Sequence, residues 1–332
     1  MKFIDLHCDT LMYAAEGMYT KDVVVTDLID MPHAMLDVLR MKQSGASTEM
    51  FAIFFPPKKD GLIHAGGKTY TDDQYFDLLY KTYKNTMNIG RDLISEAFNA
   101  QDIIQNEQAG KMSGILTFED GRILNGNLDN VKKYYDLGVR LISLTWNEEN
   151  TIGYPNSDDA TLMNKGLKPF GIDVVRAMND LGMIVDVSHL SEGGFWDVAN
   201  VSKKPFIASH SNVKSLSPHR RNLTDDMIRA MANAGGISGV NMAPQFLNAD
   251  INIKDSTIDL MSLHLRTMIN LGGEDFPALG SDFDGTSGNL EIDCITKFPR
   301  LFDRLNKHGV SDRVVEKIVY GNAFRVIKDV MK

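Results

Sequence analysis

Cysteine is scarce in this 332-residue sequence, which has only Cys8 and Cys294 and so supplies no disulfide framework. No apolar run reaches the roughly 18 residues that a membrane span requires, and no leader precedes the first apolar stretch. Lys and Arg number 35 against 44 Asp and Glu, and the net charge of -9 argues against nucleic acid or an anionic membrane as a partner. We therefore expect a cytoplasmic protein that binds neither nucleic acid nor membrane.

What the sequence does have is an ordinary globular composition, with 43% hydrophobic and 24% charged residues. This is enough to bury a large core. The length permits two domains, but it also suits one α/β barrel with insertions, and no linker-like stretch divides the chain. We expect a single catalytic barrel domain over residues 1–332.

Short apolar runs rich in β-branched residues recur along the chain, each followed by a polar cluster and a helix-like segment. The eight runs are 3–9, 50–55, 112–119, 139–146, 183–189, 205–210, 236–242 and 278–285. The helix-like segments are 72–99, a shorter one up to 109, 128–137, 168–179, 193–201, 225–234, 256–270, 298–307 and 311–330, and a glycine-containing loop covers 58–70. Alternating strands and helices of this number predict a parallel (β/α)8 barrel of the TIM type.

Polar side chains fall at the carboxyl ends of these runs, where such barrels carry their catalytic residues. They are His7 and Asp9, Glu119, His189, His210 and Asp282. One imidazole beside a carboxylate would fit a capped turn, but five runs that end in this way favour ligands of a divalent metal. His33, His64, His264 and His308 have no such placement, and we interpret them as surface or packing residues, while His219 could reach the mouth.

The same positions carry a resemblance. The stretches Asp5-Leu6-His7-Cys8-Asp9, Asp186-Val187-Ser188-His189 and Ser209-His210-Ser211, the run Arg220-Arg221-Asn222, and Ser281-Asp282-Phe283-Asp284-Gly285 occur in this order, with Glu119 after the third run. Together they resemble the dipeptidases related to mammalian renal (membrane) dipeptidase, peptidase family M19, over nearly the whole chain. Such relatives are metal-dependent hydrolases on a barrel of the expected type.

The resemblance implies two Zn²⁺ ions per chain, although other divalent metals are open. His7 and Asp9 would hold one ion, His189 and His210 the other, and Glu119 would bridge them, which makes it catalytic as well as a ligand. A metal-bridging hydroxide would attack the peptide carbonyl of a small dipeptide. Asp282 would accept the proton and pass it to the departing amine.

The resemblance also implies a grip on the substrate. Arg221 matches the residue that holds the substrate's terminal carboxylate, and relatives often accept a D-residue at the carboxyl-terminal position. Trp146 and Asn147 stand where mammalian relatives carry a histidine thought to contact the carbonyl oxygen, so we expect them to bind substrate. Asp284 lies on the face of Asp282 if the strand continues, but we interpret Asp284-Gly285 as a turn.

Two other classes of function remain open from the sequence. One is another binuclear-metal barrel hydrolase that acts on a cyclic amide, a lactone or a phosphoester. The other is a barrel that binds a ligand without catalysis, although an intact ligand set speaks against it. A homodimer is expected from the resemblance alone.

Overall fold

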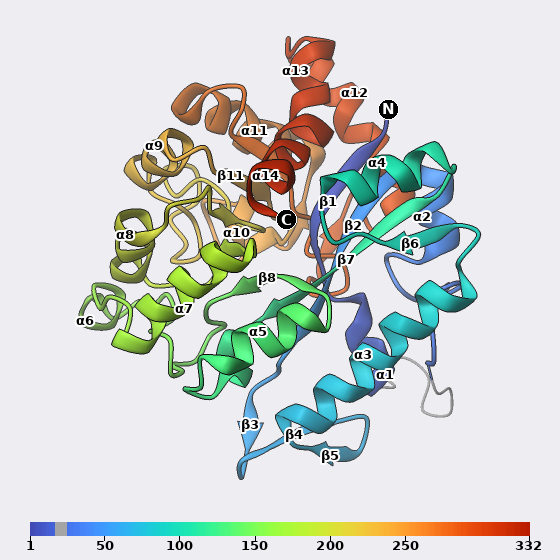
Figure 1. The fold of residues 1–332 in the computed structure, drawn as a ribbon. Coiled ribbons are helices and arrows are strands. Elements are labelled where there is room, and N and C mark those ends of the chain that lie inside the picture. The colour runs from blue at the N-terminus through green and yellow to red at the C-terminus, as the bar shows by residue number, and fades with distance from the viewer. Residues whose placement is uncertain (17–24) are drawn as a thin grey trace.

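Eight parallel strands close into a barrel in the computed structural model, which describes residues 1–16 and 25–332 (Figure 1). Their order around the barrel is β2, β1, β13, β11, β10, β9, β8 and β7, and β7 pairs again with β2. Their bounds are β1 Phe3–Cys8, β2 Ala46–Phe54, β7 Met112–Glu119, β8 Val139–Ser143, β9 Ile184–Asp186, β10 Ile207–Ala208, β11 Ile237–Val240 and β13 Pro277–Leu279. The predicted (β/α)8 barrel is confirmed, and each predicted run overlaps one of these strands, although β2 and β13 begin before their runs at 50–55 and 278–285.

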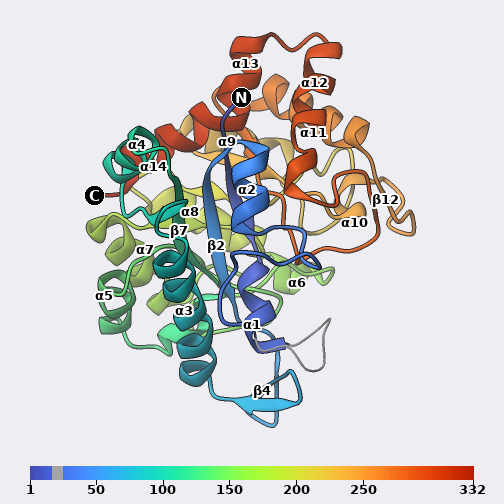
Figure 2. The ribbon, with the colours of Figure 1, turned by 90° about the vertical axis from the view of Figure 1, so that its right-hand side faces the viewer.

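Helices surround this barrel, as Figures 1 and 2 show from two sides. They are α1 Tyr13–Glu16, α2 Val38–Ser44, α3 Asp72–Ile89, α4 Ala100–Gln108, α5 Asp129–Asp136, α6 Ala160–Met163, α7 Pro169–Leu181, α8 Glu192–Val201, α9 Asp225–Asn233, α10 Pro244–Leu247, α11 Ile258–Gly272, α12 Pro299–Lys307, α13 Asp312–Glu316 and α14 Asn322–Val330. Short strands outside the barrel are β3 Lys58–Lys59, β4 Leu62–Ala65, β5 Lys68–Tyr70, β6 Ile94–Glu96, β12 Asp255–Ser256 and β14 Asn289–Leu290. None of the described helices is long and apolar enough to cross a membrane.

The barrel interior holds an inner apolar cluster to which every barrel strand contributes. Its strand members are Ile4, Leu6, Met50, Ile115, Leu141, Ile184, Ile207, Ile237 and Ala278. Helix α14 adds four buried side chains at a spacing of three or four, Ala323, Val326, Ile327 and Val330, and Figure 1 shows this helix across the ring of strands. Burying each large aliphatic side chain contributes about 1.5–3 kcal/mol. This apolar interior leaves the other end of the barrel for polar groups.

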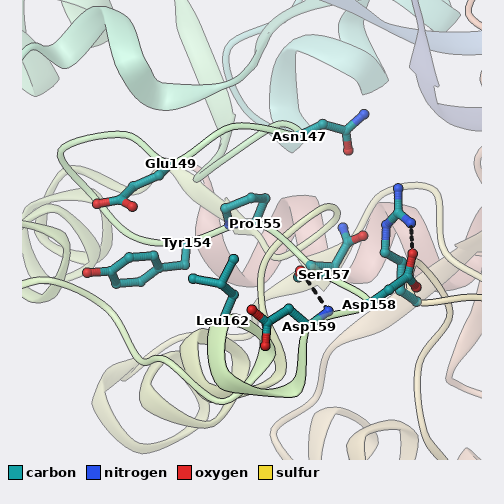
Figure 3. Close-up of a pocket in the computed structure, with 10 residues that line it drawn as sticks. Asn147, Glu149, Tyr154, Pro155, Ser157, Asp158, Asp159 and Leu162 are labelled. Carbon is teal, nitrogen blue, oxygen red and sulfur yellow. Dashed lines mark hydrogen bonds and ion pairs between the residues drawn. The ribbon is translucent and has the colours of Figure 1, made fainter.

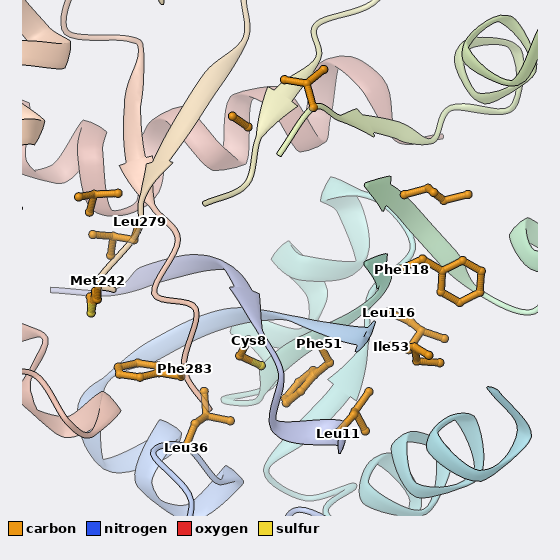
Figure 4. Close-up of a cluster of buried hydrophobic side chains, with 14 of the residues drawn as sticks. Cys8, Leu11, Leu36, Phe51, Ile53, Leu116, Phe118, Met242, Leu279 and Phe283 are labelled. Atoms are coloured by element: carbon orange, nitrogen blue, oxygen red, sulfur yellow. The ribbon is translucent and has the colours of Figure 1, made fainter. Parts of the chain in front are cut away.

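A larger outer cluster lies between the strands and the surrounding helices. Figure 4 shows Cys8, Phe51, Phe118 and Phe283 among its members. Cys8 lies between the site residues His7 and Asp9, and it is fully buried in this cluster. The apolar side chains of the strands thus divide between this outer cluster and the inner one.

Strand β1 departs from a strict alternation. Asp5 pairs with Glu49 and Cys8 with Phe51, so three steps on β1 match two on β2. Such a bulge re-aims the residues that follow it. As a result Leu6 belongs to the inner cluster and Cys8 to the outer one, and His7 turns toward the carboxyl end of the barrel.

The predicted helix over 72–99 is wrong beyond residue 89. Helix α3 ends at Ile89, Gly90 follows as its cap, and β6 then runs parallel to the start of β7. A new helix, α4, begins after Asn99, whose side chain accepts hydrogen bonds from the backbone N–H groups of Gln101 and Asp102. Gly90 and Asn99 are cap residues that divide this stretch, although its hydrophobic residues keep a helical spacing on both sides of them.

Two further segments differ from expectation. The predicted loop 58–70 is a three-stranded antiparallel sheet, β3–β4–β5, whose β4–β5 turn uses Gly66 and Gly67 at positive φ (Figure 2). The predicted helix 311–330 is interrupted by a π-helical turn, Lys317–Gly321, between α13 and α14. Neither change moves the strand ends that carry the site.

Candidate metal centre

Six side chains at or near the carboxyl ends of five strands meet at one end of the barrel. His7 and Asp9 follow from β1, Glu119 ends β7, and His189, His210 and Asp282 lie just beyond β9, β10 and β13. All six are at most 9% exposed. A cavity of about 490 Å³ opens above them and is lined by Asp9, Glu119, His189 and Asp282 together with Arg221, Trp146 and Asn147. The structure therefore brings every residue predicted for the site to one place.

Glu119 lies between two pairs of ligand atoms. Its Oε2 is 3.5 Å from His7 Nε2, which in turn is 3.6 Å from Asp9 Oδ1. Its Oε1 is 2.8 Å from His189 Nε2 and 3.5 Å from His210 Nε2. Each carboxylate oxygen thus faces a different pair, which is the arrangement of a carboxylate that bridges two cations.

Buried atoms in this cluster fit a metal. His189 Nε2 and His210 Nε2 are 3.1 Å apart, and two nitrogens bound to one tetrahedral Zn²⁺ would be separated by roughly 3.3 Å. On the other side, His7 Nε2 and Asp9 Oδ1 are buried and have no hydrogen-bond partner among the described residues. Unpartnered buried polar atoms are costly, so a cation between them is the natural occupant. The residues present fit a pair of divalent ions.

The pKa values of these side chains determine which of them can bind a cation at neutral pH. Burial alone would raise the pKa of Glu119, but the neighbouring histidines, His7 first, hold that pKa well below its usual range. Burial first, and the charge of Arg221 second, lower the pKa of His189 to about 3. Burial opposes protonation of His7, yet Glu119 and Asp9 outweigh it and the pKa of His7 lies well above its usual range. At neutral pH the Glu119 carboxylate and the His189 imidazole are therefore in their metal-binding forms, while His7 must lose a proton.

Asp282 is held by Asn241, a residue that the sequence analysis did not single out. The Asn241 side-chain amide donates to Asp282 Oδ2 at 2.9 Å, and Asp282 N donates to the His7 carbonyl at 3.2 Å. Asn241 is the polar residue at the end of the seventh apolar run, so the signal that found the ligands could have found it. Asp282 also has a positive φ of 61°, a conformation that a strained functional turn retains.

Asp284 and Gly285 form the predicted turn, but Asp284 does more than turn the chain. Its carboxylate accepts hydrogen bonds from Thr10 Oγ1 at 2.6 Å and from the backbone N–H of Met35 at 2.7 Å. A Cβ on Gly285 would overlap the carboxylate oxygens of Asp9 and Asp282. This glycine therefore lets the backbone pass directly beside the acidic side of the site.

Arg221 is a buried cation without a carboxylate partner in the described part of the chain. It is 6% exposed, its two terminal nitrogens donate to Ser211 Oγ at 3.3 Å and the His210 carbonyl at 3.4 Å, and Nε has no partner among the described residues. Burial lowers the pKa of Arg221 to about 10, although Asp282 opposes this shift. The adjacent Arg220 instead forms an ion pair with Asp158. Of these two arginines, Arg221 is the one that lines the cavity above the ligands.

The cavity has an aromatic side. Trp146 packs edge-to-face against Phe54 with ring centroids 4.9 Å apart and lies 6.1 Å from the His189 ring. Phe54 ends β2 and was not predicted, because an aromatic residue at the end of an apolar run carries no distinguishing signal. His219, which was left ambiguous, packs against Phe246 with ring centroids 4.7 Å apart and the rings tilted by 56°, and it does not line the cavity.

Two asparagine side chains anchor the loop after β8 to the site. Asn147 Oδ1 lies 3.0 Å from His189 Nδ1, and both the backbone N–H and the side-chain amide of Asn156 donate to the His189 carbonyl. A second pocket of about 420 Å³ shares Asn147 with the first, and Figure 3 shows Glu149, Tyr154 and Asp158 around it. The loop thus fixes the position of one ligand from two sides.

The chain was compared with known proteins. The family described as "Membrane dipeptidase (Peptidase family M19)" matches residues 1–332. "Dipeptidase tcpJ" of Claviceps purpurea is 29% identical over 302 residues, which are 89% of this chain and 69% of that protein. The crystal structure of dipeptidase AC, a metallopeptidase of family M19, is 25% identical with a TM-score of 0.87 and covers 100% of this chain and 99% of its own.

A further solved structure shares the fold. It is a metallopeptidase from Rhodobacter sphaeroides liganded with a phosphinate mimic of the dipeptide L-Ala-D-Ala, 24% identical, with a TM-score of 0.86 and 99% of each chain covered. The match over the whole chain, together with the geometry at the strand ends, shows the family. The chain belongs to the membrane dipeptidase family, peptidase family M19, and is a metal-dependent hydrolase of peptide bonds.

Proposed function

We propose that this chain is a zinc-dependent dipeptidase that hydrolyses small dipeptides. One observation carries the proposal: a ligand set divided around Glu119 shares its cavity with Arg221, a buried guanidinium that has no carboxylate partner among the described residues. A dipeptide brings both of the groups that this cavity lacks, a peptide carbonyl and, one residue away, a free carboxylate.

The ligand assignment follows the two sides of Glu119. We assign His7 and Asp9 to one ion, His189 and His210 to the other, and Glu119 to both. When bound, two such ions supply a nucleophile at neutral pH and polarise the carbonyl of the substrate. Because Glu119 carries one negative charge between them, it offsets their mutual repulsion.

Asp282 is the proposed proton carrier. Its carboxylate lines the cavity, and the Asn241 amide occupies one of its oxygens, which leaves Oδ1 for the proton. Burial raises the pKa of Asp282, although the charge of His7 opposes this shift, and a raised pKa brings a carboxyl group closer to the pH at which it can both take and give a proton. Asp282 would take the proton at the start of the reaction and give it to the departing amine.

Arg221 is the proposed grip on the substrate's terminal carboxylate, and Trp146 and Asn147 are proposed to contact the rest of the substrate. A guanidinium binds a carboxylate with two parallel hydrogen bonds, which fixes distance as well as charge. If the carboxylate lies at Arg221, the scissile bond one residue away lies at the ions. Longer peptides would place their carboxylate elsewhere, so the grip favours dipeptides.

We further propose that a D-residue is accepted at the carboxyl-terminal position. The family resemblance supports this, as does the L-Ala-D-Ala mimic held by the Rhodobacter sphaeroides protein of the same fold. We also place the protein in the cytoplasm as one catalytic domain that forms a homodimer. The cytoplasmic assignment is supported by two cysteines, Cys8 and Cys294, that do not pair.

A substrate panel with the Zn²⁺-loaded protein tests the proposal. It contains L-Ala-L-Ala, L-Ala-D-Ala, the amide of each, a tripeptide, and a cyclic amide, a lactone and a phosphotriester. We expect the free dipeptides to be turned over fastest and the amides and tripeptide poorly. Turnover of the cyclic amide, lactone or phosphotriester without dipeptide turnover would contradict the proposal, and so would Zn²⁺ binding with no turnover at all.

A further inference from the structure

Asp186, at the end of β9, is a fully buried carboxylate that touches no ligand atom of the proposed metal centre directly. Four donors surround it. The backbone N–H groups of Ser188 and Ser209 donate to its Oδ1, both at 2.9 Å. The hydroxyls of Ser143 and Ser209 donate to its Oδ2, the latter at 2.6 Å. Each carboxylate oxygen therefore has two fixed hydrogen-bond partners.

Ser209 connects this carboxylate to a metal ligand. Its Oγ lies 2.8 Å from His210 Nδ1 as well as 2.6 Å from Asp186 Oδ2. A serine hydroxyl has one hydrogen, and an ionised carboxylate has none to give. Because Ser209 donates its hydrogen to Asp186, it can only accept from His210. His210 must then carry its hydrogen on Nδ1, which leaves the Nε2 lone pair facing Glu119 and His189.

The neighbouring ligand follows the same rule with a different partner. His189 Nδ1 lies 3.0 Å from Asn147 Oδ1, and an amide oxygen can only accept, so His189 also carries its hydrogen on Nδ1. His7 has no such support, since its Nδ1 has no partner among the described residues. The two histidines on one side of Glu119 are thus oriented from behind by dedicated hydrogen bonds.

We propose that Asp186, acting through the Ser209 hydroxyl, is a positioning residue that sets the tautomer of His210 and thereby keeps its Nε2 able to bind metal. This inference rests on the ligand role proposed for His210, and it does not depend on the identity of the substrate. Outer partners of metal-bound histidines commonly contribute 10- to 100-fold to metal affinity.

Asp186→Asn is the sharpest test because it reverses the hydrogen-bond direction without changing the shape. The backbone N–H groups of Ser188 and Ser209 donate to the Oδ1 position, so the amide oxygen of the new asparagine must stand there. Its NH2 group then faces the hydroxyls of Ser143 and Ser209. Ser209 then accepts from residue 186 and turns its hydrogen to the nearer of its two remaining neighbours, which is His210 Nδ1 at 2.8 Å rather than the Ser188 hydroxyl at 3.3 Å. The hydrogen of His210 moves to Nε2, and metal binding must displace it. We expect Zn²⁺ affinity, measured by competition with a chelator, to fall by roughly 100-fold.

Two serine variants separate positioning from simple support of the structure. Ser209→Ala removes the link and should cost roughly 10-fold in Zn²⁺ affinity. Ser143→Ala is the matched control, because Ser143 donates to the same oxygen of Asp186 but does not contact His210, and it should bind Zn²⁺ like the parent. The double variant Asp186→Asn/Ser209→Ala lacks the hydroxyl that imposes the wrong tautomer. Its Zn²⁺ affinity should recover to that of Ser209→Ala. If the two substitutions were merely structural defects, their losses of Zn²⁺ affinity would instead add.

The tautomer can be observed without metal. Long-range ¹H–¹⁵N spectra of the metal-free protein should show His210 protonated on Nδ1 in the parent and on Nε2 in Asp186→Asn. A parent protein that binds Zn²⁺ no better than its Asp186→Asn variant, a double variant weaker than Asp186→Asn, or equal losses in Ser209→Ala and Ser143→Ala would overturn the inference. If Asp186→Asn does not fold, the comparison of the two serine variants decides. A parent protein that binds no Zn²⁺ would overturn the proposed metal centre as well.

Discussion

The two sides of Glu119 are built in different ways. On one side, His189 and His210 are held through their side chains, with Asn147 behind the first and Ser209 and Asp186 behind the second. On the other side, support comes from the backbone. Asp9 N donates to the Phe283 carbonyl at 2.8 Å, and the His7 carbonyl accepts from Asp282 N and Ser281 Oγ. We call these the histidine side (His189 and His210) and the β1 side (His7 and Asp9).

The difference follows from where each ligand lies on its strand. His189 and His210 lie just beyond the ends of short strands, so side-chain hydrogen bonds must fix their rings. His7 is inside a six-residue strand, and the loop after β13 joins it through main-chain hydrogen bonds. The histidine side is therefore sensitive to single side-chain changes behind the ligands, and the β1 side to changes of the backbone around Gly285.

The largest effect is expected from Glu119→Gln, because Glu119 is what joins the two sides. The substitution keeps the shape but removes the charge between the cations, and an amide offers only one oxygen. We expect metal occupancy to fall and hydrolysis to be nearly abolished, measured by elemental analysis and dipeptide turnover. Full occupancy with full activity in this variant would defeat the bridging assignment.

Asp282→Asn should leave metal binding intact on both sides of Glu119 and remove the proposed proton carrier. We expect both metals to stay bound while kcat falls by roughly 10²- to 10⁴-fold, the usual contribution of general acid–base catalysis. Elemental analysis and steady-state kinetics on the same preparation measure the two effects. Asp282 also lies close to His7 and Asp9. If metal is lost together with activity, Asp282 is instead a ligand of the β1 side.

Arg221→Met tests the grip that lies over the histidine side. Losing one half of a buried charged pair costs about 2–5 kcal/mol, and each 1.4 kcal/mol is about a factor of ten. The kcat/KM for free dipeptides should therefore fall by roughly 30- to 3,000-fold.

The dipeptide amide is the control for this variant, because it offers no carboxylate. It should be a poor substrate for the parent and change little on substitution. Lys at position 221 should restore only part of the activity, since it supplies charge without a second parallel hydrogen bond. Equal losses on acid and amide would show that Arg221 supports the structure instead of the substrate.

The smallest effect is a proton count that distinguishes the two sides. In the metal-free protein the raised pKa of His7 keeps it protonated at neutral pH, whereas the lowered pKa of His189 leaves it neutral. Metal binding to the β1 side must release that proton, so affinity there should rise with pH until pH exceeds the pKa of His7. Calorimetric titration with Zn²⁺ in buffers of different ionisation enthalpy should show net proton release near pH 7, because burial also raises the pKa of Asp9 on the same side. No release would mean that His7 is already neutral.

The fold was largely predictable because each strand left a local signal. Short apolar runs recurred along the chain, and the structure has a barrel strand that overlaps each of them. The helix boundaries were less predictable from the sequence. Gly90 and Asn99 are cap residues inside a stretch with a continuous helical period, and only the pairing of β6 with β7, a long-range contact, divides it.

The residues of the candidate site could be predicted from the sequence, but the residues and the strand register that hold them in position could not. His7, Glu119 and His210 could be identified because each is a polar side chain at a strand end. Asp186 ends β9 and Asn241 lies just beyond β11, but their roles depend on distances across neighbouring strands. The bulge in β1 leaves no mark in the sequence, since it is defined by register against β2.

One titration tests the central claim most directly. Metal-free protein is titrated with Zn²⁺ while metal bound per chain and turnover of a free dipeptide are followed together. The account predicts that binding saturates at about two ions per chain and that turnover, absent at the start, reaches its plateau at the same point. Saturation at one ion, or dipeptide turnover by the metal-free protein, would contradict it.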